Sequence, residues 1–172
     1  TDSQKISLDE ILADIAKPNP MNRLLQGDVG SGKTAVAAVA AVVSAHAGYQ
    51  SVFMAPTEIL ARQHYHTLTK IFKSFENGIA LITGSEARVF HGEHLEEKIS
   101  KAKLIKDIEA GTVSIVVGTH ALIAREAGTV KNKKAGLKIK FPRLGLVIID
   151  EQHRFGVNQR AALVSHSRAE SS

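Results

Sequence analysis

Hydrophobic positions along this chain fall into two alternating patterns, short unbroken apolar runs and longer stretches with helical spacing. We expect strands over residues 51–55, 79–83, 114–117 and 144–149, which are apolar and contain β-branched residues, and a short strand over residues 23–26 before the glycine-rich turn. The helical spacing predicts helices over residues 7–17, 33–46, 58–72 and 92–110. This alternation is typical of an α/β fold, an open and mainly parallel sheet with helices on both faces.

Local residues set the expected helix boundaries. Ser7 and Glu10 have the spacing of a capping box, Pro18 stops the first helix, and Gly48 closes the second. On the last two helices, the residues expected to face inward are Leu60, Leu68, Ile71 and Phe75, and then Leu95, Ile99, Ala102, Ile105 and Ile108. His64 and His66 resemble a metal-binding pair, but helical neighbours two positions apart point in different directions, so we interpret them as ordinary helix residues.

Composition excludes several classes of protein. At 172 residues and 44% hydrophobic, the chain can build the core of one domain, so wholesale disorder is excluded. There is no cysteine, which excludes disulfide scaffolds, thiolate zinc sites and cysteine nucleophiles. The longest apolar run, at residues 35–43, is far shorter than the roughly 20 residues that span a bilayer, so we expect no membrane association and a cytoplasmic protein.

The formal charge of +5 has a local origin. No acidic residue lies between Glu126 and Asp150, whereas the interval contains Lys131, Lys133, Lys134, Lys138, Lys140 and Arg143. The rest of the chain is nearly neutral. The segment 131–140 therefore either contacts a phosphate-bearing partner such as DNA or forms a solvated hairpin tip, and composition favours the solvated loop.

A glycine-rich sequence between the first predicted strand and the second helix carries the strongest chemical signal. It reads Gly27, Asp28, Val29, Gly30, Ser31, Gly32, Lys33, Thr34 and matches the phosphate-binding loop at every fixed position. Glycines allow successive backbone N–H groups to surround an anion, and the following helix adds its positive end. Lys33 can reach the β- and γ-phosphates of ATP, and the Thr34 hydroxyl can bind Mg²⁺. The alternative is a glycine-rich turn that happens to precede a helix, and such a turn would not be expected to match the motif at every fixed position.

The strand predicted at 144–149 ends in two acids, Asp150 and Glu151. Asp150 at the carboxyl end of a strand can hold Mg²⁺, and Glu151 can polarise the water that attacks ATP. A solvated acidic pair would be an equal alternative if the phosphate loop were absent. The two signals together predict the two halves of a P-loop nucleotide site.

Several further segments match the motifs of one helicase family in the same order. They are residues 21–34 (MNRLLQGDVGSGKT), 54–64 (MAPTEILARQH), 83–84 (TG), 118–123 (GTHALI) and the string LGLVIIDEQHRFGVNQ that ends at Gln159. Together they resemble RecG, a family of bacterial superfamily-two DNA helicases that migrate branched DNA. The likeness runs from Thr1 to about Leu163. The transcription-repair coupling translocases are the nearest alternative, and they usually carry Glu where this chain has Gln152.

The resemblance implies roles for individual residues. Gln4 corresponds to a glutamine that reads the adenine edge, where an amide can pair with both N6 and N7. Gln152 and His153 correspond to residues that link the γ-phosphate to the DNA motifs. Positions at which relatives contact a DNA strand are Pro56, Thr57, Glu58, Thr83, Gly84, Gly118, Thr119 and His120. Their chemistry suits contacts to the DNA backbone. For Thr57, a helix N-cap is an equally good interpretation, and both roles can hold together.

From the resemblance we expect the first RecA-like motor domain of an ATP-dependent helicase that acts on branched or forked DNA without reading sequence. The expected domain spans residues 1–172, is incomplete at its C-terminal end and has a divergent tail at 164–172. A second motor domain and a wedge domain of the parent chain are implied as partners. A nucleotide-binding module without turnover is an alternative from another class, and Glu151 favours the enzyme because a binding module needs no water-activating carboxylate. A small-molecule P-loop kinase is a weaker alternative.

Overall fold

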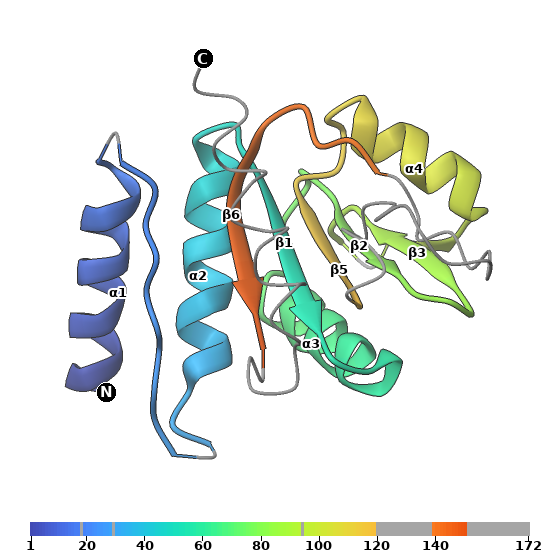
Figure 1. The fold of residues 1–172 in the computed structure, drawn as a ribbon. Helices are drawn as coiled ribbons and strands as arrows, with labels where there is room; N and C mark the ends of the chain where they lie inside the picture. The colour runs from blue at the N-terminus through green and yellow to red at the C-terminus, as the bar shows by residue number, and fades with distance from the viewer. Residues whose placement is uncertain (18, 29, 94, 120–138, 151–172) are drawn as a thin grey trace, which may run out of the picture.

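The computed structural model describes all of the chain except residues 18, 29, 94, 120–138 and 151–172. Six strands form one sheet in the order β4-β3-β2-β5-β1-β6 (Figure 1). Their bounds are β1 Gln50–Ala55, β2 Ile79–Ile82, β3 Ala87–Phe90, β4 Glu96–Lys98, β5 Ile115–Thr119 and β6 Leu144–Ile149. The helices are α1 Asp2–Ile15, α2 Lys33–His46, α3 Glu58–Ile71 and α4 Lys101–Glu109.

The central four strands, β2, β5, β1 and β6, are parallel, whereas β3 and β4 add an antiparallel edge. Because strand side chains alternate between faces, β1 contributes to two cores. Phe53 lies in the core beneath α2 and α3, and Val52 lies in the core beneath α4. The expected α/β fold, a mainly parallel sheet with helices on both faces, is therefore confirmed.

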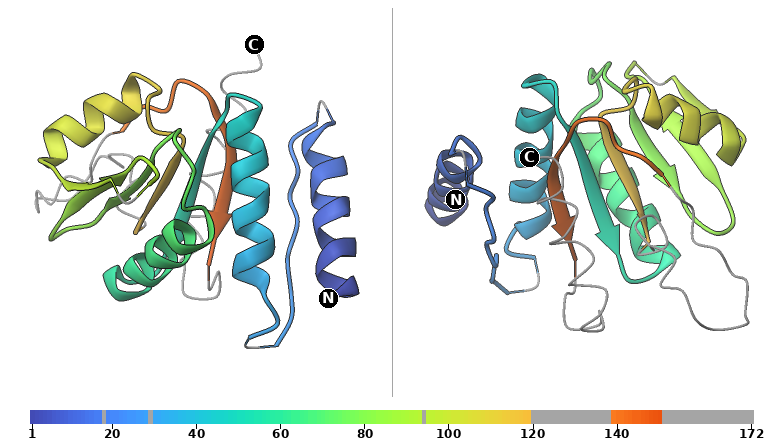
Figure 2. Two further views of the ribbon diagram at one scale, coloured as in Figure 1. Left: turned by 180° about the vertical axis from the view of Figure 1, so that it is seen from behind. Right: turned by 45° about the horizontal axis from the view of Figure 1, so that its top comes forward.

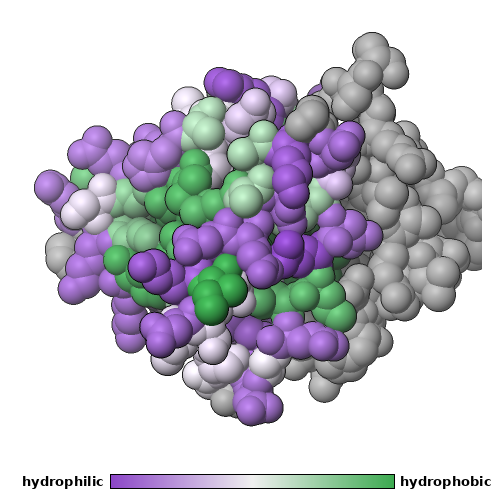
Figure 3. Space-filling model, turned by 90° about the vertical axis from the view of Figure 1, so that its left-hand side faces the viewer, coloured by the Kyte–Doolittle hydropathy of each residue, from purple (hydrophilic) through white to green (hydrophobic). Residues whose placement is uncertain are grey.

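Helix α1 is the outermost element and lies on the far side of α2 from the sheet (Figures 1 and 2). It buries only Ile11, and its outer face mixes hydrophilic and hydrophobic residues (Figure 3). The helix begins at Asp2 rather than near Ser7, because Thr1 and Gln4 form the capping box that was expected at Ser7 and Glu10. Thr1-x-x-Gln4 has the same spacing, so the sequence contains two candidate boxes and the earlier one is used.

The strand predicted over residues 23–26 is wrong. This segment runs extended between α1 and α2, and it joins no ladder with the strands that the structure describes (Figures 1 and 2). The Arg23 guanidinium binds the carboxylates of Asp14 and Glu10 on α1, with its Nη2 donating to Asp14 Oδ2 at 2.6 Å. These ion pairs and the packing of Leu25 on the core hold the segment against the helices.

The helix predicted over residues 92–110 is also wrong at its start. Its first part contains the short strand β4, which pairs with the unpredicted β3, and the helix α4 begins only after Ser100. Ser100 caps that helix by accepting a hydrogen bond of 3.2 Å from the Lys103 N–H. Leu104 and Ile108 are its buried residues, whereas Leu95, expected to face inward, is 65% exposed. On α3, the expected inward residue Ile71 is likewise exposed.

Candidate active site

The carboxyl ends of the four parallel strands bring the sequence motifs to one edge of the sheet. Thr119 at the end of β5 pairs with Ala55 of β1, directly before Pro56, and Gly118 pairs with Ile82 of β2, directly before Thr83. On the other side of β1, the Asp150 N–H donates to the Met54 carbonyl at 2.9 Å. The order across this edge is therefore the segment 83–84, then 118–119, then 56–58, then Asp150. In open parallel sheets ligands bind at this edge.

The phosphate loop leads directly into α2, whose first residue is Lys33. Gly30 and Gly32 have φ angles of 83° and 88°, a left-handed conformation that glycine adopts at little cost. A side chain at Gly32 would be strained by this φ angle, and it would displace the Gln4 amide, whose Nε2 would lie 2.0 Å from the added Cβ. Thr34, the second residue of α2, is half-buried.

Polar side chains bind the carbonyl groups of this loop. The Lys33 ammonium donates to the carbonyl oxygens of Gly27 at 2.6 Å and of Asp28 at 2.8 Å. The Gln4 amide donates to the Ser31 carbonyl at 2.7 Å. The structure thus places Gln4, a residue of α1, against the phosphate loop, although 27 positions separate Gln4 from Ser31.

Asp150 lies at the end of β6, and its side chain is 33% exposed. Its Oδ2 is 2.7 Å from Nε2 of His64, a residue on the buried face of α3. His64 and His66 point apart as expected, His64 inward and His66 to the surface. His64 is nevertheless no ordinary helix residue, because it contacts the carboxylate that the sequence assigns to magnesium.

The segment after β1 contains Thr57, which caps α3. Its Oγ1 accepts a hydrogen bond of 3.3 Å from the Leu60 N–H, so the N-cap interpretation is confirmed. The neighbouring Glu58 reaches the segment after β2, where its Oε2 accepts a bond of 2.7 Å from the Ser85 hydroxyl. A Cβ on Gly84 would lie 2.6 Å from the other carboxylate oxygen. Glu58 therefore joins the first two predicted DNA-contact segments.

Thr83 is 2% exposed, and its hydroxyl is used inside its own turn. The Thr83 Oγ1 accepts hydrogen bonds from the backbone N–H groups of Ser85 at 3.3 Å and Glu86 at 3.2 Å. What this turn presents at the surface is Gly84 and Ser85, both of which are exposed. Lys101 of α4 also donates to the Gly84 carbonyl.

A cluster of charged side chains supports this turn. Arg62 of α3 binds Glu86 and donates to the Ser85 hydroxyl at 2.8 Å, while Arg88 Nε donates to Glu86 Oε2 at 2.7 Å. The hydrogen bond from Arg88, followed by that from Arg62, holds the pKa of Glu86 below its ordinary value. The Ser85 hydroxyl lowers the pKa of Glu58 in the same way. Both carboxylates are thus kept ionised by their partners.

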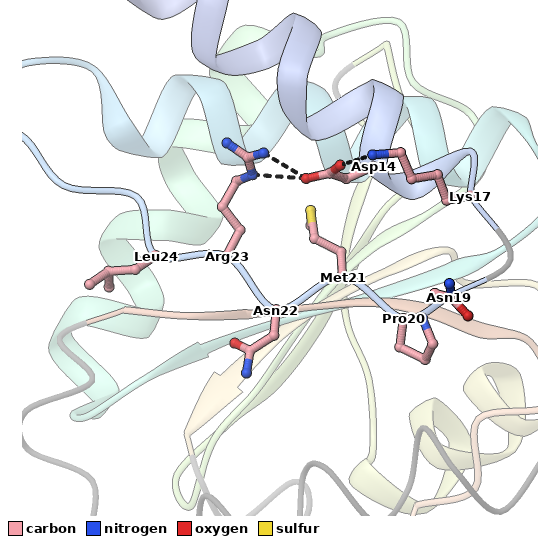
Figure 4. Close-up of a pocket in the computed structure, with 8 residues that line it drawn as sticks. All are labelled: Asp14, Lys17, Asn19, Pro20, Met21, Asn22, Arg23 and Leu24. Atoms are coloured by element: carbon pink, nitrogen blue, oxygen red, sulfur yellow. Dashed lines mark hydrogen bonds and ion pairs between the residues drawn. The ribbon is translucent and has the colours of Figure 1, made fainter.

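Several predicted site residues lie outside the described part of the chain, namely Val29, His120, Glu151, Gln152 and His153. Gly118 is buried within β5, and Thr119 is half-buried at its end. A pocket of about 430 Å³ lies elsewhere, between α1 and the segment 19–24, where Asp14 binds both Arg23 and Lys17 (Figure 4). No residue of the phosphate loop lines this pocket.

The donor set at this edge fits a magnesium–nucleotide complex. Mg²⁺ is usually held by one or two protein oxygens together with substrate phosphates and water, so a complete protein cage is not required. Thr34 and Asp150 supply a hydroxyl and a carboxylate of this kind. Among the described residues, no group of three or more His, Asp or Glu side chains forms a metal site by itself.

Comparison with known protein families decides the assignment. Residues 1–170 match the family described as DEAD/DEAH box helicase. The chain belongs to this family. The DEAD/DEAH box helicase match and the parallel sheet with its phosphate loop agree with the RecA-like architecture expected from sequence. Within the described residues, no helix is both long enough and apolar enough to cross a bilayer.

Individual relatives within this family show to which helicases the chain is similar. The chain is 46% identical over 163 residues to proteins named ATP-dependent DNA helicase RecG from Borreliella burgdorferi and Bacillus subtilis. It is 42% identical over 168 residues to the RecG of Thermotoga maritima. These matches cover 95% to 98% of the chain, so the resemblance to RecG is confirmed. The chain spans only 19% to 21% of the length of these relatives.

Two features of the site were not predicted from sequence. His64 occupies a buried position in the helical pattern of Ala61, Tyr65 and Leu68, and a polar residue within such a pattern is the signal that marks it. Ser85 follows the predicted Thr83 and Gly84 and binds Glu58, but no spacing rule connects residues on two different loops.

Proposed function

We propose that this chain is the first RecA-like motor domain of a RecG-type helicase that hydrolyses ATP and moves along branched or forked DNA. In this proposal the domain comprises residues 1–172 and acts in the cytoplasm, together with a second motor domain and a wedge domain of a longer protein. One observation carries the proposal: Asp150 and three predicted DNA-contact segments lie side by side along the carboxyl edge of one parallel sheet, and α2 begins at the same end of that sheet (Figure 1).

Residues at the start of α2 and on α1 would bind the nucleotide. Backbone N–H groups of residues 27–34 and the positive end of α2 hold the phosphates. Lys33 exchanges its loop carbonyls for the β- and γ-phosphates, because a charge-assisted contact to phosphate is stronger than one to a neutral carbonyl. Gln4, already placed against the loop at Ser31, pairs with the adenine edge.

Residues after β6 would support hydrolysis of the bond between the β- and γ-phosphates. Thr34 and Asp150 would hold Mg²⁺, which neutralises negative charge on the phosphates when it is bound. Glu151 accepts a proton from the attacking water, and Gln152 and His153 connect the γ-phosphate to the DNA contacts. The roles of Asp150 and Glu151 rest on their place directly after the apolar strand β6, whereas those of Gln152 and His153 rest on the resemblance to RecG.

The three segments beside Asp150 would contact a DNA strand through its backbone. The exposed positions are Thr57, Gly84 and Ser85, and they supply N–H and hydroxyl groups that bind phosphate without reading sequence. The remaining predicted contacts are Pro56, Glu58, Thr119 and His120, whereas the buried Thr83 and Gly118 would shape the edge from within. The carboxylate of Glu58 already accepts a hydrogen bond from the Ser85 hydroxyl, so its role is to hold the segment after β1 against the segment after β2.

The test is ATP turnover by the whole protein containing this chain, measured without DNA, with linear duplex and with a four-way junction. We expect turnover to rise with DNA and to be highest with the junction. Equal stimulation by linear duplex would favour a translocase of the transcription-repair coupling type. Nucleotide binding without turnover under any condition would contradict the proposal and favour a non-hydrolysing module.

A further inference from the structure

A buried histidine contacts the carboxylate at the end of β6. His64 is 8% exposed, and its Nε2 lies 2.7 Å from Asp150 Oδ2. The imidazole ring also packs against the ring of Phe53 on β1, with ring centroids 4.6 Å apart. An ionised carboxylate carries no proton to donate, so a hydrogen bond to it at this position uses the imidazole tautomer that bears its proton on Nε2.

Asp150 is thereby fixed at two points. Its backbone N–H donates to the Met54 carbonyl of β1 at 2.9 Å, and its carboxylate is bound by α3 through His64. The first contact sets where the residue lies, and the second sets how the carboxylate is rotated. His64 itself is fixed by the stacking on Phe53 and by its place among the buried residues of α3.

We propose that His64 is a positioning residue that holds Oδ2 of Asp150 and thereby directs the other carboxylate oxygen toward the magnesium ion. The inference rests on the proposed function, in which Asp150 serves Mg²⁺. Partners that bind a ligating carboxylate from outside commonly change metal affinity by about 10- to 100-fold when they are removed. His64 also lies on the helix that Thr57 caps, so the same helix contacts both Asp150 and the proposed DNA edge.

Three substitutions separate this role from that of a core residue that only fills space. His64→Phe keeps the ring and its packing on Phe53 but removes the donor. His64→Gln places an amide nitrogen near the position of Nε2. His64→Asn places its amide nitrogen near the position of Nδ1, so this shorter side chain does not reach Asp150. His66→Phe on the exposed face of α3 is the matched control.

The experiment measures Mn²⁺ binding by electron paramagnetic resonance in the whole protein with saturating ADP, alongside thermal melting. We expect His64→Phe and His64→Asn to weaken Mn²⁺ binding about 10-fold, and His64→Gln and His66→Phe to stay within about threefold of wild type. Equal affinities in all variants would overturn the proposal. The proposal would also be overturned if the losses of Mn²⁺ affinity followed the losses of melting temperature and His64→Gln bound Mn²⁺ no better than His64→Asn.

Asp150→Asn distinguishes a failure of the proposal on His64 from a failure of the proposed magnesium role of Asp150. If the wild type binds Mn²⁺ and Asp150→Asn weakens binding while His64→Phe does not, only the inference on His64 fails. If Asp150→Asn binds Mn²⁺ as tightly as wild type, the magnesium role of Asp150 fails, and the inference on His64 is overturned with it.

Discussion

The side-chain amide of Gln4 lies against the phosphate loop and donates a hydrogen bond of 2.7 Å to the carbonyl of Ser31. This bond joins the outermost helix, α1, to the loop that precedes α2. The amide also lies directly over Gly32, where even a methyl group would overlap with it. The first turn of α1 therefore lies against the phosphate loop, the proposed nucleotide site, although the helix contributes little to the core.

Replacing Gln4 with Ala should lower the affinity for ATP about 10-fold and leave the affinity for GTP unchanged. The reason is that an amide can present an N–H donor and its carbonyl acceptor side by side, which match N7 and N6 of adenine but not the two acceptors N7 and O6 of guanine. Competition against a fluorescent ADP measures both affinities, with Lys5→Ala on the same helix turn as the control. An equal loss for ATP and GTP would instead assign Gln4 to supporting the loop at Ser31.

Replacing Lys33 with Ala should lower nucleotide affinity at least tenfold. A charge-assisted contact contributes about 1.5–3 kcal/mol, and about 1.4 kcal/mol corresponds to a factor of ten. Fluorescence titration with labelled ADP checks this, and Lys70→Ala on the exposed face of α3 controls for loss of a positive charge. Equal affinity in wild type and Lys33→Ala would contradict the assignment of residues 27–34 as a phosphate site.

The two acids after β6 should give different phenotypes in the whole protein. Glu151→Gln retains shape and hydrogen bonding but loses the base, so ATP should still bind while turnover falls roughly 100-fold or more. Asp150→Asn should also raise the Mg²⁺ concentration needed for half-maximal turnover. Steady-state turnover and nucleotide titration separate the two effects. A normal rate in Glu151→Gln would mean that another residue activates the water.

Glu86 should make the fold sensitive to acid. Arg88 and Arg62 lower the pKa of Glu86 below its ordinary value of 4.5, so the native state binds its proton less readily than the unfolded chain does. The stabilisation is fully present above that ordinary value and is lost as pH falls toward the lowered pKa. Glu86→Gln should therefore reduce the melting temperature near neutral pH and flatten its fall below about pH 4.5.

Thermal melting between about pH 3 and pH 7 tests this prediction, with the exposed Glu76→Gln as the control. The control should follow wild type over the whole range. If Glu86→Gln and wild type lost stability in parallel on acidification, the acid response would come from other carboxylates, such as Glu58 beside Ser85.

The basic segment 131–140 lies almost entirely outside the described residues, and its contact with DNA stays a prediction. If the segment binds phosphates, replacing Lys131, Lys133 and Lys134 with Gln should reduce the salt dependence of DNA affinity. The slope of log affinity against log salt should fall by about two to three units, because each lysine that neutralises a phosphate adds close to one unit. Binding measured by fluorescence anisotropy over a salt series provides the slope. An unchanged slope would identify the segment as a solvated loop.

Elements whose pattern was purely local were predicted well. Helix α2 begins and ends at the expected residues, because the phosphate loop sets its start and Gly48 sets its end. Strand β6 was also predicted with its observed bounds, since an apolar segment that ends in Val147, Ile148 and Ile149 is typical of a parallel strand. The expected position of Asp150 at the carboxyl end of its strand followed from this segment and is observed.

The failures involve contacts between distant residues. Segment 23–26 was predicted as a strand, but its only apolar residues are Leu24 and Leu25, Arg23 binds two acids of α1 and the segment joins no ladder among the described strands. The short strand β4 is stabilised by pairing with β3 and by Arg88, which donates to Glu96 at 3.3 Å. His64 was misjudged for the same reason, since its partner is 86 positions away.

The opposite edge of the sheet depends on Gln50, a buried amide that is 3% exposed. Its Nε2 donates to the carbonyls of Ile108 and Val113, each at 2.9 Å, and its Oε1 accepts from the Arg143 N–H at 3.4 Å. Losing the amide would leave buried carbonyls unsatisfied at about 1–3 kcal/mol each. In a saturation mutagenesis screen, substitutions here should therefore deplete cellular protein abundance, whereas those around Lys33 and Asp150 should abolish genetic complementation at normal abundance.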